Sequence, residues 1–324
     1  MLNVRSIRRL QTVCNLSSRL KPIFQLRQFV LAAVLMLIVS SGWSAANGQQ
    51  VQSVPVTKCG TVLSAPGSYA LSQSLKTLSP TQDCIQISSP GVLFLLGNYN
   101  LSGPSSKVGT TVGIHVLSAA SGVRIQGGSS TVQNFGKGIV IEASGVSLIN
   151  LNVAGNVAQG ILVNNASNVL IQNVTSAGNG AAGLELAQST GVIVSSELSA
   201  LQQNGTYGLW VHSSSNNQFL DVNANQNSRG GIYVGETDDD KDAQPDSYTN
   251  AGVAPSQHNV FLGGDTVVNT GDGIRIGAGD TLNVVVGVAS QENTGTDAVD
   301  GNGNCTSNTW SANIFGTKNP SCLQ

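Results

Sequence analysis

A four-residue pattern of alternating hydrophobic positions occurs in seven copies between residues 113 and 276. Each copy, here called a repeat word, has Gly first, Ile or Leu second, a variable third residue, and Val, Ile or Leu fourth. The words begin at Gly113, Gly138, Gly160, Gly183, Gly208, Gly231 and Gly273. Their starts are 25, 22, 23, 25, 23 and 42 residues apart. A repeat of this length with period-two hydrophobicity predicts a β-solenoid in which each repeat forms one coil.

The repeat that begins at Gly138 shows how one coil divides into strands. Its hydrophobic positions predict three short strands, at Ile139–Ile141, Val146–Ile149 and Leu151–Val153, with small polar residues at the corners. No stretch keeps the 3.6-residue spacing of an amphipathic helix, so we expect few helices. The glycine of each word is expected to supply the backbone freedom that a corner needs.

Asparagines also keep fixed places in the repeats. One position holds Asn150, Asn173 and Asp221, and a position six residues later holds Asn156, Asn179, Asn227 and Asn293. Equivalent Asn side chains in stacked coils can hydrogen-bond to one another and to the neighbouring backbone, and Asn tolerates left-handed corners. Asn is also a common turn residue, but the constant offset favours an asparagine ladder.

The chain is predicted to divide into segments with different tasks. These are a signal peptide at 1–46, a flexible linker at 47–58, an N-terminal cap with the first coils at 59–112, the repeats at 113–304 with an acidic insertion at 235–257, and a C-terminal cap at 305–324. An open solenoid end exposes both core and strand edges. We therefore expect Trp310, Ile314 and Phe315 to plug the last coil.

The N-terminal leader dominates the positive charge of the chain. Six of the 15 basic residues lie within residues 1–27, ahead of the hydrophobic run Phe29–Val39 and a stretch of small residues. This order predicts a cleaved export signal, since the run is shorter than the roughly 20 residues of a membrane-spanning helix, and a membrane anchor is the alternative. The rest of the chain carries nine basic and 17 acidic residues, a net charge of −8. We therefore expect a secreted, periplasmic or cell-surface bacterial protein, with no membrane attachment after cleavage and no nucleic-acid partner.

Four cysteines remain after the leader, and their number is even, as is typical of an exported protein with disulfides. Three pairings are possible. Two cysteines lie at each end of the repeats, which favours Cys59–Cys84 and Cys305–Cys322. Free buried thiols are the alternative.

The repeat words resemble those of right-handed parallel β-helix proteins, the pectate-lyase-like superfold, over about residues 59–322. The CGT…DCI opening and the NCTSNTWSANIFGT…PSC closing are similar to a secreted bacterial branch of that group. The resemblance implies an all-β, right-handed parallel β-helix with disulfide-pinned ends. It implies no single activity, because this fold hosts lyases, hydrolases, epimerases, adhesins and phage tailspikes. The motifs of polygalacturonase-like hydrolases and of pectate lyases are absent from the sequence.

The third residue of each word is expected to face outward, because neighbouring residues on a strand point to opposite sides. Stacking the words gives a first outward column of His115, Val140, Leu162, Glu185, Trp210, Tyr233 and Arg275. A second column two residues later contains Glu142, Ala187 and His212. Exposed aromatic rings beside charged groups are typical of sugar-binding surfaces.

From these columns we predict a substrate-binding face made of Glu142, Glu185, Trp210, His212, Tyr233 and Arg275, with Glu185, His212 and Arg275 as candidate catalytic residues. Glu142 and Glu185 lie two coils apart, at least about 10 Å, which is too far for the paired carboxylates of glycoside hydrolysis. Ordinary strand surfaces also carry such residues, so an unspecialised surface is the alternative.

The acidic insertion is the second candidate site. Asp238, Asp240, Asp242 and Asp246 follow a D-x-D-x-D-x-x-x-D spacing similar to the calcium loops of thrombospondin type 3 repeats, with Ala243 in place of a glycine. Alternating carboxylates in a turn supply the oxygen ligands that Ca²⁺ prefers. A solvated acidic loop is the alternative. The three histidines, His115, His212 and His258, lack the spacing of a zinc site.

Together these patterns predict an exported β-helix protein that binds an extracellular polysaccharide or cell-surface glycan. Cleavage or modification of that glycan, by a lyase, glycoside hydrolase or epimerase-like activity, stays open. The alternative is a non-catalytic structural or adhesive cell-surface protein.

Overall fold

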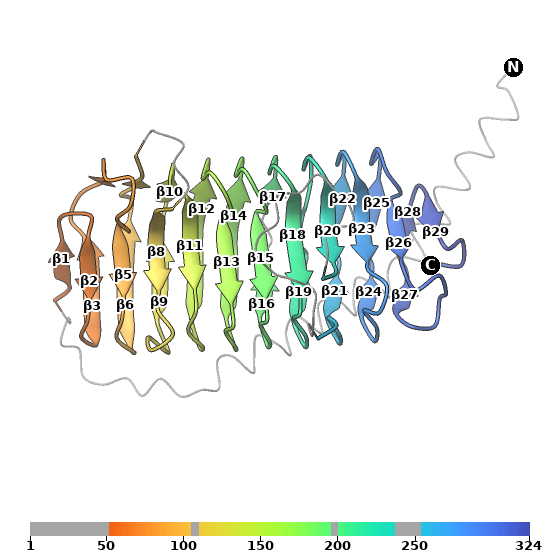
Figure 1. Cartoon of the computed structure of the whole chain (residues 1–324), viewed down its shortest axis with the longest axis horizontal. Coiled ribbons are helices and arrows are strands. Elements are labelled where there is room, and N and C mark those ends of the chain that lie inside the picture. The colour runs from red at the N-terminus through yellow and green to blue at the C-terminus, as the bar shows by residue number, and fades with distance from the viewer. Residues whose placement is uncertain (1–51, 105–109, 196–199, 237–253) are drawn as a thin grey trace, which may run out of the picture. The chain divides into compact units, whose positions relative to one another are not determined.

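A computed structural model describes residues 52–104, 110–195, 200–236 and 254–324 (Figure 1). Gln52–Gln324 forms one compact unit. The regular elements in the described ranges are all β-strands, and none of these ranges contains a helix long and hydrophobic enough to cross a membrane. The expected signal peptide, the four candidate calcium-binding aspartates and most of the acidic insertion lie outside the described residues.

An 11-stranded parallel sheet carries the repeat words. In order, its strands are β2 (Thr61–Leu63), β5 (Ile85–Ile87), β8 (Val112–Val116), β11 (Lys137–Ile141), β13 (Ile161–Asn164), β15 (Leu184–Ala187), β18 (Tyr207–His212), β20 (Gly230–Val234), β23 (Asp272–Ile276), β26 (Ala298–Asp300) and β29 (Lys318–Asn319). Figure 1 shows these strands side by side in chain order, each one coil further along.

A 15-stranded sheet takes the next segments of each coil, and all its recorded strand pairs are parallel. Its main path is β1 (Val54–Val56), β3 (Gly67–Leu71), β6 (Val92–Gly97), β9 (Arg124–Gly127), β12 (Ser147–Ala154), β14 (Leu170–Ala177), β16 (Ile193–Ser195), β19 (Gln218–Leu220), β21 (Val260–Leu262), β24 (Val284–Val286) and β27 (Thr309–Ser311). Four short strands pair beside this path: β4 (Leu75–Lys76), β7 (Leu101–Ser102), β10 (Thr131–Gln133) and β17 (Leu201–Gln202). A three-stranded sheet contains β22 (Asp265–Val267), β25 (Ala289–Gln291) and β28 (Ile314–Phe315).

The hydrophobic core lies between the sheets and runs through all the coils. The second and fourth residues of all seven words are at most 3% exposed, which confirms that they face inward. They pack with residues of the 15-stranded sheet, such as Ile125, Leu148 and Phe219, in one continuous cluster. The all-β parallel solenoid predicted from the words is therefore confirmed.

The predicted asparagine ladder is confirmed and is longer than expected. The side-chain Nδ2 of each member donates to Oδ1 of the next at 2.9–3.1 Å, from Asn156 through Asn179, Asn204, Asn227 and Asn269 to Asn293. The backbone N–H of each of these residues except the last donates to the same Oδ1 atoms. The ladder thus satisfies buried polar groups at one corner of six coils.

The expectation that word glycines supply corner freedom is wrong, because none of the seven has a positive φ. They are needed for space. A Cβ added at Gly183 would lie 2.6 Å from Asn204 Nδ2, and one at Gly273 would lie 2.6 Å from Asn293 Nδ2. The left-handed positions are instead Asn150, with φ of 56°, and its equivalents in other coils.

The two predicted disulfides, Cys59–Cys84 and Cys305–Cys322, are confirmed. The first joins Cys59, just before β2, to Cys84, just before β5, and the second encloses β27, β28 and β29. Each therefore fastens coils at one end of the solenoid.

Several predicted boundaries differ from the structure. The two strands expected at Val146–Ile149 and Leu151–Val153 are one strand, β12, which continues through the left-handed residue Asn150. The expected flexible linker contains β1, which pairs with β3 and buries Val56, so residues 54–56 belong to the solenoid.

The C-terminal segment is also more regular than a cap. Its strands β27, β28 and β29 pair with β24, β25 and β26, so they continue the coils. Trp310 is 8% exposed and packs edge-on against Phe315, as expected of a plug. Ile314 is 58% exposed, so its assignment to the plug is wrong. The pleat of the two-residue strand β28 points Ile314 and Phe315 to opposite sides.

Candidate functional site

The third residues of the words form the predicted outward column. In-register pairs join His115 to Val140, Val140 to Leu162, Leu162 to Glu185, Glu185 to Trp210, Trp210 to Tyr233, and Tyr233 to Arg275. In the second column, Asn164, Ala187 and His212 pair in the same way. The strand register therefore places the candidate residues as the sequence predicts, whereas their roles stay predictions.

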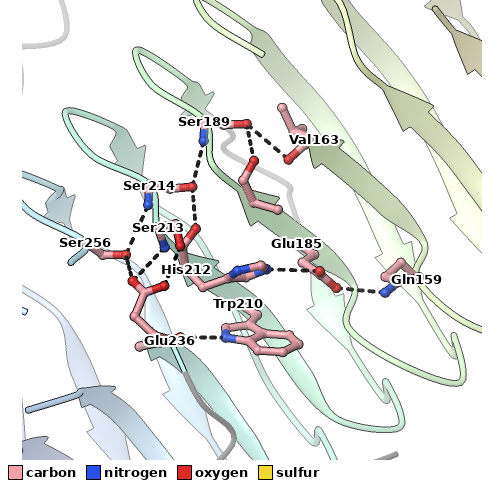
Figure 2. Close-up of polar contacts among 12 residues, drawn as sticks. Gln159, Val163, Glu185, Ser189, Trp210, His212, Ser213, Ser214, Glu236 and Ser256 are labelled. Carbon is pink, nitrogen blue, oxygen red and sulfur yellow. Dashed lines mark hydrogen bonds and ion pairs between the residues drawn. The ribbon is translucent and has the colours of Figure 1, made fainter. Parts of the chain in front are cut away.

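Glu185 and His212 form a buried hydrogen-bonded pair between β15 and β18. Glu185 Oε1 lies 3.1 Å from His212 Nε2, and Gln159 Nε2 donates to Glu185 Oε2 at 2.8 Å. The side chains of Glu185 and His212 are only 2% and 3% exposed. Figure 2 shows Gln159, Glu185 and His212 in one line of contacts across neighbouring coils. Each carboxylate oxygen of Glu185 therefore has a hydrogen-bond partner, and these two contacts fix the position of the carboxylate.

Aromatic rings cover the neighbouring part of the column. The Trp210 ring centroid lies 4.7 Å from that of His212 and 6.0 Å from that of Tyr207. Trp210 Nε1 donates to the carbonyl oxygen of Gly235 at 3.0 Å (Figure 2). Tyr207 and Tyr233 lie 5.0 Å apart by ring centroids.

The expectation that Tyr233 is an exposed aromatic is wrong, since it is 3% exposed. Its ring packs against Tyr207, a residue that sequence reasoning did not single out because it precedes its repeat word. Trp210 is half-buried. The outward column is thus partly covered, and Val140 and Leu162 further along it are buried with Val112 and Ala187 in a small hydrophobic cluster.

A pocket of about 260 Å³ opens at the far end of the column. Its lining is contributed by β18, β20, β23 and the turns before them, and consists of Tyr207, Arg229, Gly230, Ile232, Tyr233, Gly271, Asp272 and Arg275. Arg275 Nη1 donates to Asp272 Oδ2 at 3.1 Å, and the two side chains are 36% and 22% exposed. Arg275 was predicted from its place in a word, whereas Arg229 and Asp272 lie just before words and were missed.

A second group of carboxylates borders the column beyond β20. Glu236 accepts hydrogen bonds from the backbone N–H and hydroxyl of Ser213 and from the hydroxyl of Ser256 (Figure 2). Asp280 Oδ1 accepts from the Ser256 backbone N–H at 2.7 Å. Burial raises the pKa of Asp280 to about 7; the Ser256 hydrogen bond lowers it, and the charge of Glu236 raises it further.

The third group lies near the N-terminal end of the same face. His115 Nδ1 is 3.1 Å from Asp83 Oδ2, and His115 Nε2 is 3.3 Å from Glu142 Oε2. The hydrogen bond to Asp83 raises the pKa of His115 above 6.5 and the charges of both carboxylates add to this, against a lowering by burial. Asp83 was missed because it precedes a strand, β5, that has no repeat word. The structure does not bring Glu142 to Glu185, because Glu142 directly follows β11, Glu185 lies on β15, and β13 separates these strands.

Metal ligation can be tested only for the residues that the structure describes. Among them, no group of three or more His, Cys, Asp or Glu side chains is arranged to hold a metal ion. The calcium prediction concerns residues outside these ranges and stays a prediction.

Comparisons with known proteins agree on the fold. The family model for the right handed beta helix region matches residues 93–247. No curated protein sequence matches the chain. Fifteen solved chains match it by structure. The class of protein is therefore the right-handed parallel β-helix, as the resemblance of the repeat words implies.

Three of the similar structures are of enzymes whose names refer to polysaccharides. A double mutant of the periplasmic alginate epimerase AlgG aligns over 80% of this chain and 70% of its own, with a TM-score of 0.54 and 13% identity. Pectate lyase Pel9A aligns over 73% of both chains, with a TM-score of 0.39 and 12% identity. The A-module of the Azotobacter vinelandii mannuronan C-5 epimerase AlgE6 aligns over 83% of this chain and 89% of its own, with a TM-score of 0.40 and 14% identity. At these identities, the likeness shows the fold alone.

Proposed function

We propose that this protein binds an extracellular polysaccharide that contains uronate sugars, on the outward face of the 11-stranded sheet. One observation carries the proposal. The pocket at β18, β20 and β23 combines the half-buried Tyr207 with two arginines, Arg229 and Arg275. The buried Tyr233 packs against the Tyr207 ring and supports it. Aromatic rings pack against the apolar faces of sugars, and guanidinium groups bind carboxylates through charge-assisted hydrogen bonds.

The charge of the pocket supports an acidic sugar over a neutral one. Its described lining holds two arginines and one aspartate, a local charge of +1. The chain beyond residue 27 has nine basic and 17 acidic residues, and two of these basic residues line the pocket. The Arg275–Asp272 contact fixes one guanidinium in place and leaves 36% of its side chain exposed.

Two further observations support an extracellular glycan. Two disulfides in one chain are typical of proteins from oxidising compartments outside the cytoplasm. AlgG, which shares the fold, is a periplasmic alginate epimerase. That second point is an analogy at the level of the fold and supports the class of ligand only.

The geometry supports binding more than turnover. Of the three candidate catalytic residues, Glu185 is 1% exposed and accepts hydrogen bonds at both oxygens, and His212 is 3% exposed. A general acid or base must come within hydrogen-bond reach of the proton that it transfers. We therefore assign Glu185 to positioning His212, and Arg275 to ligand binding.

Isothermal titration calorimetry with oligosaccharides tests the proposed function. Alginate or pectate oligosaccharides, which carry a carboxylate on each sugar, should bind the wild-type protein, and neutral cello-oligosaccharides of equal length should bind more weakly. Arg229→Gln should weaken uronate binding by about tenfold or more, because one charge-assisted hydrogen bond contributes about 1.5–3 kcal/mol.

Arg124→Gln is the matched control, since Arg124 is a half-buried arginine on β9 of the other sheet, hydrogen-bonded to Gln126. This control should bind like the wild type. If uronate oligosaccharides do not bind, or if Arg229→Gln and Arg124→Gln bind them with equal affinity, the polysaccharide-binding site is not the pocket at β18, β20 and β23. In the first case, the non-catalytic structural or adhesive alternative takes its place.

A further inference from the structure

The group formed by Asp83, His115 and Glu142 is separate from the proposed glycan pocket. Its histidine lies on β8 and its glutamate directly follows β11, whereas the pocket lies on β18, β20 and β23. Strands β13 and β15 lie between the two regions. Nothing in the proposed glycan binding uses these three side chains, although they face outward and are partly exposed.

Asp83 holds the His115 ring in one orientation. Its Oδ1 accepts the backbone N–H of Val112 at 2.8 Å, and its Oδ2 contacts His115 Nδ1 at 3.1 Å. The next residue, Cys84, is fixed by its disulfide to Cys59. A carboxylate anchored in this way fixes the direction in which Nε2 points, as the outer-shell carboxylates of metal-binding histidines do.

The atom that faces Nε2 lies at the distance of a second metal ligand. His115 Nε2 and Glu142 Oε2 are 3.3 Å apart. Two ligands at about 2.0–2.1 Å from one tetrahedral zinc ion are themselves about 3.3 Å apart. An imidazole nitrogen with carboxylate oxygens suits Zn²⁺ and similar transition-metal ions better than Ca²⁺, which prefers oxygen ligands alone.

We propose that His115 Nε2 and the Glu142 carboxylate bind a divalent transition-metal ion such as Zn²⁺, with Asp83 as the residue that orients the imidazole. The ion takes the place of the proton between Nε2 and Oε2. The His115 and Glu142 side chains are 20% and 36% exposed, so water can complete the coordination. With two protein ligands the site is open, and the remaining positions are available to oxygen atoms of a ligand.

The Glu185–His212 pair shows why exposure matters for this inference. Its N–O distance, 3.1 Å, is similar, but its side chains are 2% and 3% exposed and Gln159 occupies the second carboxylate oxygen. No water can reach an ion there. A metal site is therefore assigned to the exposed pair alone.

Titration of the full chain with Zn²⁺, measured by isothermal titration calorimetry, tests the assignment. Excess Ca²⁺ in the buffer occupies any site made of carboxylates alone. The wild type should bind Zn²⁺, His115→Gln should weaken binding by at least about tenfold, and Asp83→Asn by about tenfold to 100-fold. His258→Gln, which changes an exposed histidine elsewhere, should bind like the wild type.

Electron paramagnetic resonance with Cu²⁺ in place of Zn²⁺ supplies a readout that a merely structural role would not give. Coupling to one imidazole nitrogen should appear in the wild type and in His258→Gln, and should vanish in His115→Gln. Glu142→Gln serves as a second variant, with an expected tenfold or greater loss of zinc affinity. Equal zinc affinity and unchanged nitrogen coupling in His115→Gln would overturn the assignment.

Discussion

Two histidine–glutamate pairs on the same sheet follow one geometric rule and end in opposite environments. In each, the third residue of one word meets a residue two positions later in the next coil: His115 meets Glu142, and Glu185 meets His212. The N–O distances are 3.3 and 3.1 Å. The first pair has side chains 20% and 36% exposed, whereas those of the second are 2% and 3% exposed.

The difference teaches that the repeat sets which side chains meet, and the surroundings set what the contact does. Gln159 and the Trp210 ring enclose the Glu185–His212 pair, so that pair orders the strands beneath the aromatic rings. Asp83 supports the His115–Glu142 pair from one side only and leaves the other side to solvent. A buried pair is costly to break, and an exposed pair is free to exchange partners.

The largest expected effect is on the buried pair. Glu185→Ala should lower the unfolding free energy by about 3–5 kcal/mol, because His212 would stay buried without its carboxylate partner. Urea denaturation followed by circular dichroism measures the loss. Glu185→Gln, which keeps an acceptor for Gln159, should lose less. A Glu185→Ala variant as stable as the wild type would show that the pair is not buried in solution.

A smaller loss is expected from the word that carries Glu185. Gly183→Ala would place a Cβ 2.6 Å from Asn204 Nδ2, and such overpacking costs about 1–3 kcal/mol. The contact with the Gly208 carbonyl oxygen, at 2.9 Å, stays when Asn204 is changed. In the double variant with Asn204→Ala, the two losses should still sum to more than the measured total, because the shorter contact with Asn204 is removed. Strict additivity of the two denaturation results would mean that the ladder does not explain the glycine.

Asp280 is expected to make stability depend on pH. Its pKa rises from 3.8 to about 7 on folding, so the native state binds more protons between these values. The stabilising contribution of the protonated group is complete below about pH 3.8 and is lost as pH rises through about 7. The melting temperature of Asp280→Asn minus that of the wild type should therefore increase as the pH rises from about 5 to about 8. A constant difference across that range would contradict the shifted pKa.

The smallest effect is expected at the exposed pair. Glu142→Gln should change the unfolding free energy by less than about 1 kcal/mol in metal-free buffer, since partly exposed ion pairs contribute little. The same denaturation series measures it. A loss as large as that of Glu185→Ala would remove the contrast between the two pairs.

The sequence was sufficient for the fold and for the column register. Alternation within each word separates core from outward positions, and parallel stacking puts equivalent positions together, so Glu185, Trp210 and Tyr233 could be aligned from the repeat words alone. The asparagine offset was readable for the same reason. The repeat words and the asparagine offset are both periodic patterns, and such patterns can be seen in a single sequence.

Contacts made outside the words could not be predicted in this way. Asp83, Tyr207 and Arg229 lie before words or beside strands that lack one, so no period marks them. Burial on the outward face depends on which side chains cover it, and the repeat words do not show this. Tyr233 was therefore expected to be exposed. The word glycines illustrate a third limit, because sequence alone does not distinguish a glycine needed for its φ from one needed for space.

The most direct test of glycan binding is the position of a bound uronate oligosaccharide in a crystal structure of the complex. The account predicts a sugar carboxylate within hydrogen-bond distance of Arg229 or Arg275, with a sugar ring against Tyr207. An oligosaccharide bound only elsewhere, for example on the outward face of the 15-stranded sheet, would contradict it.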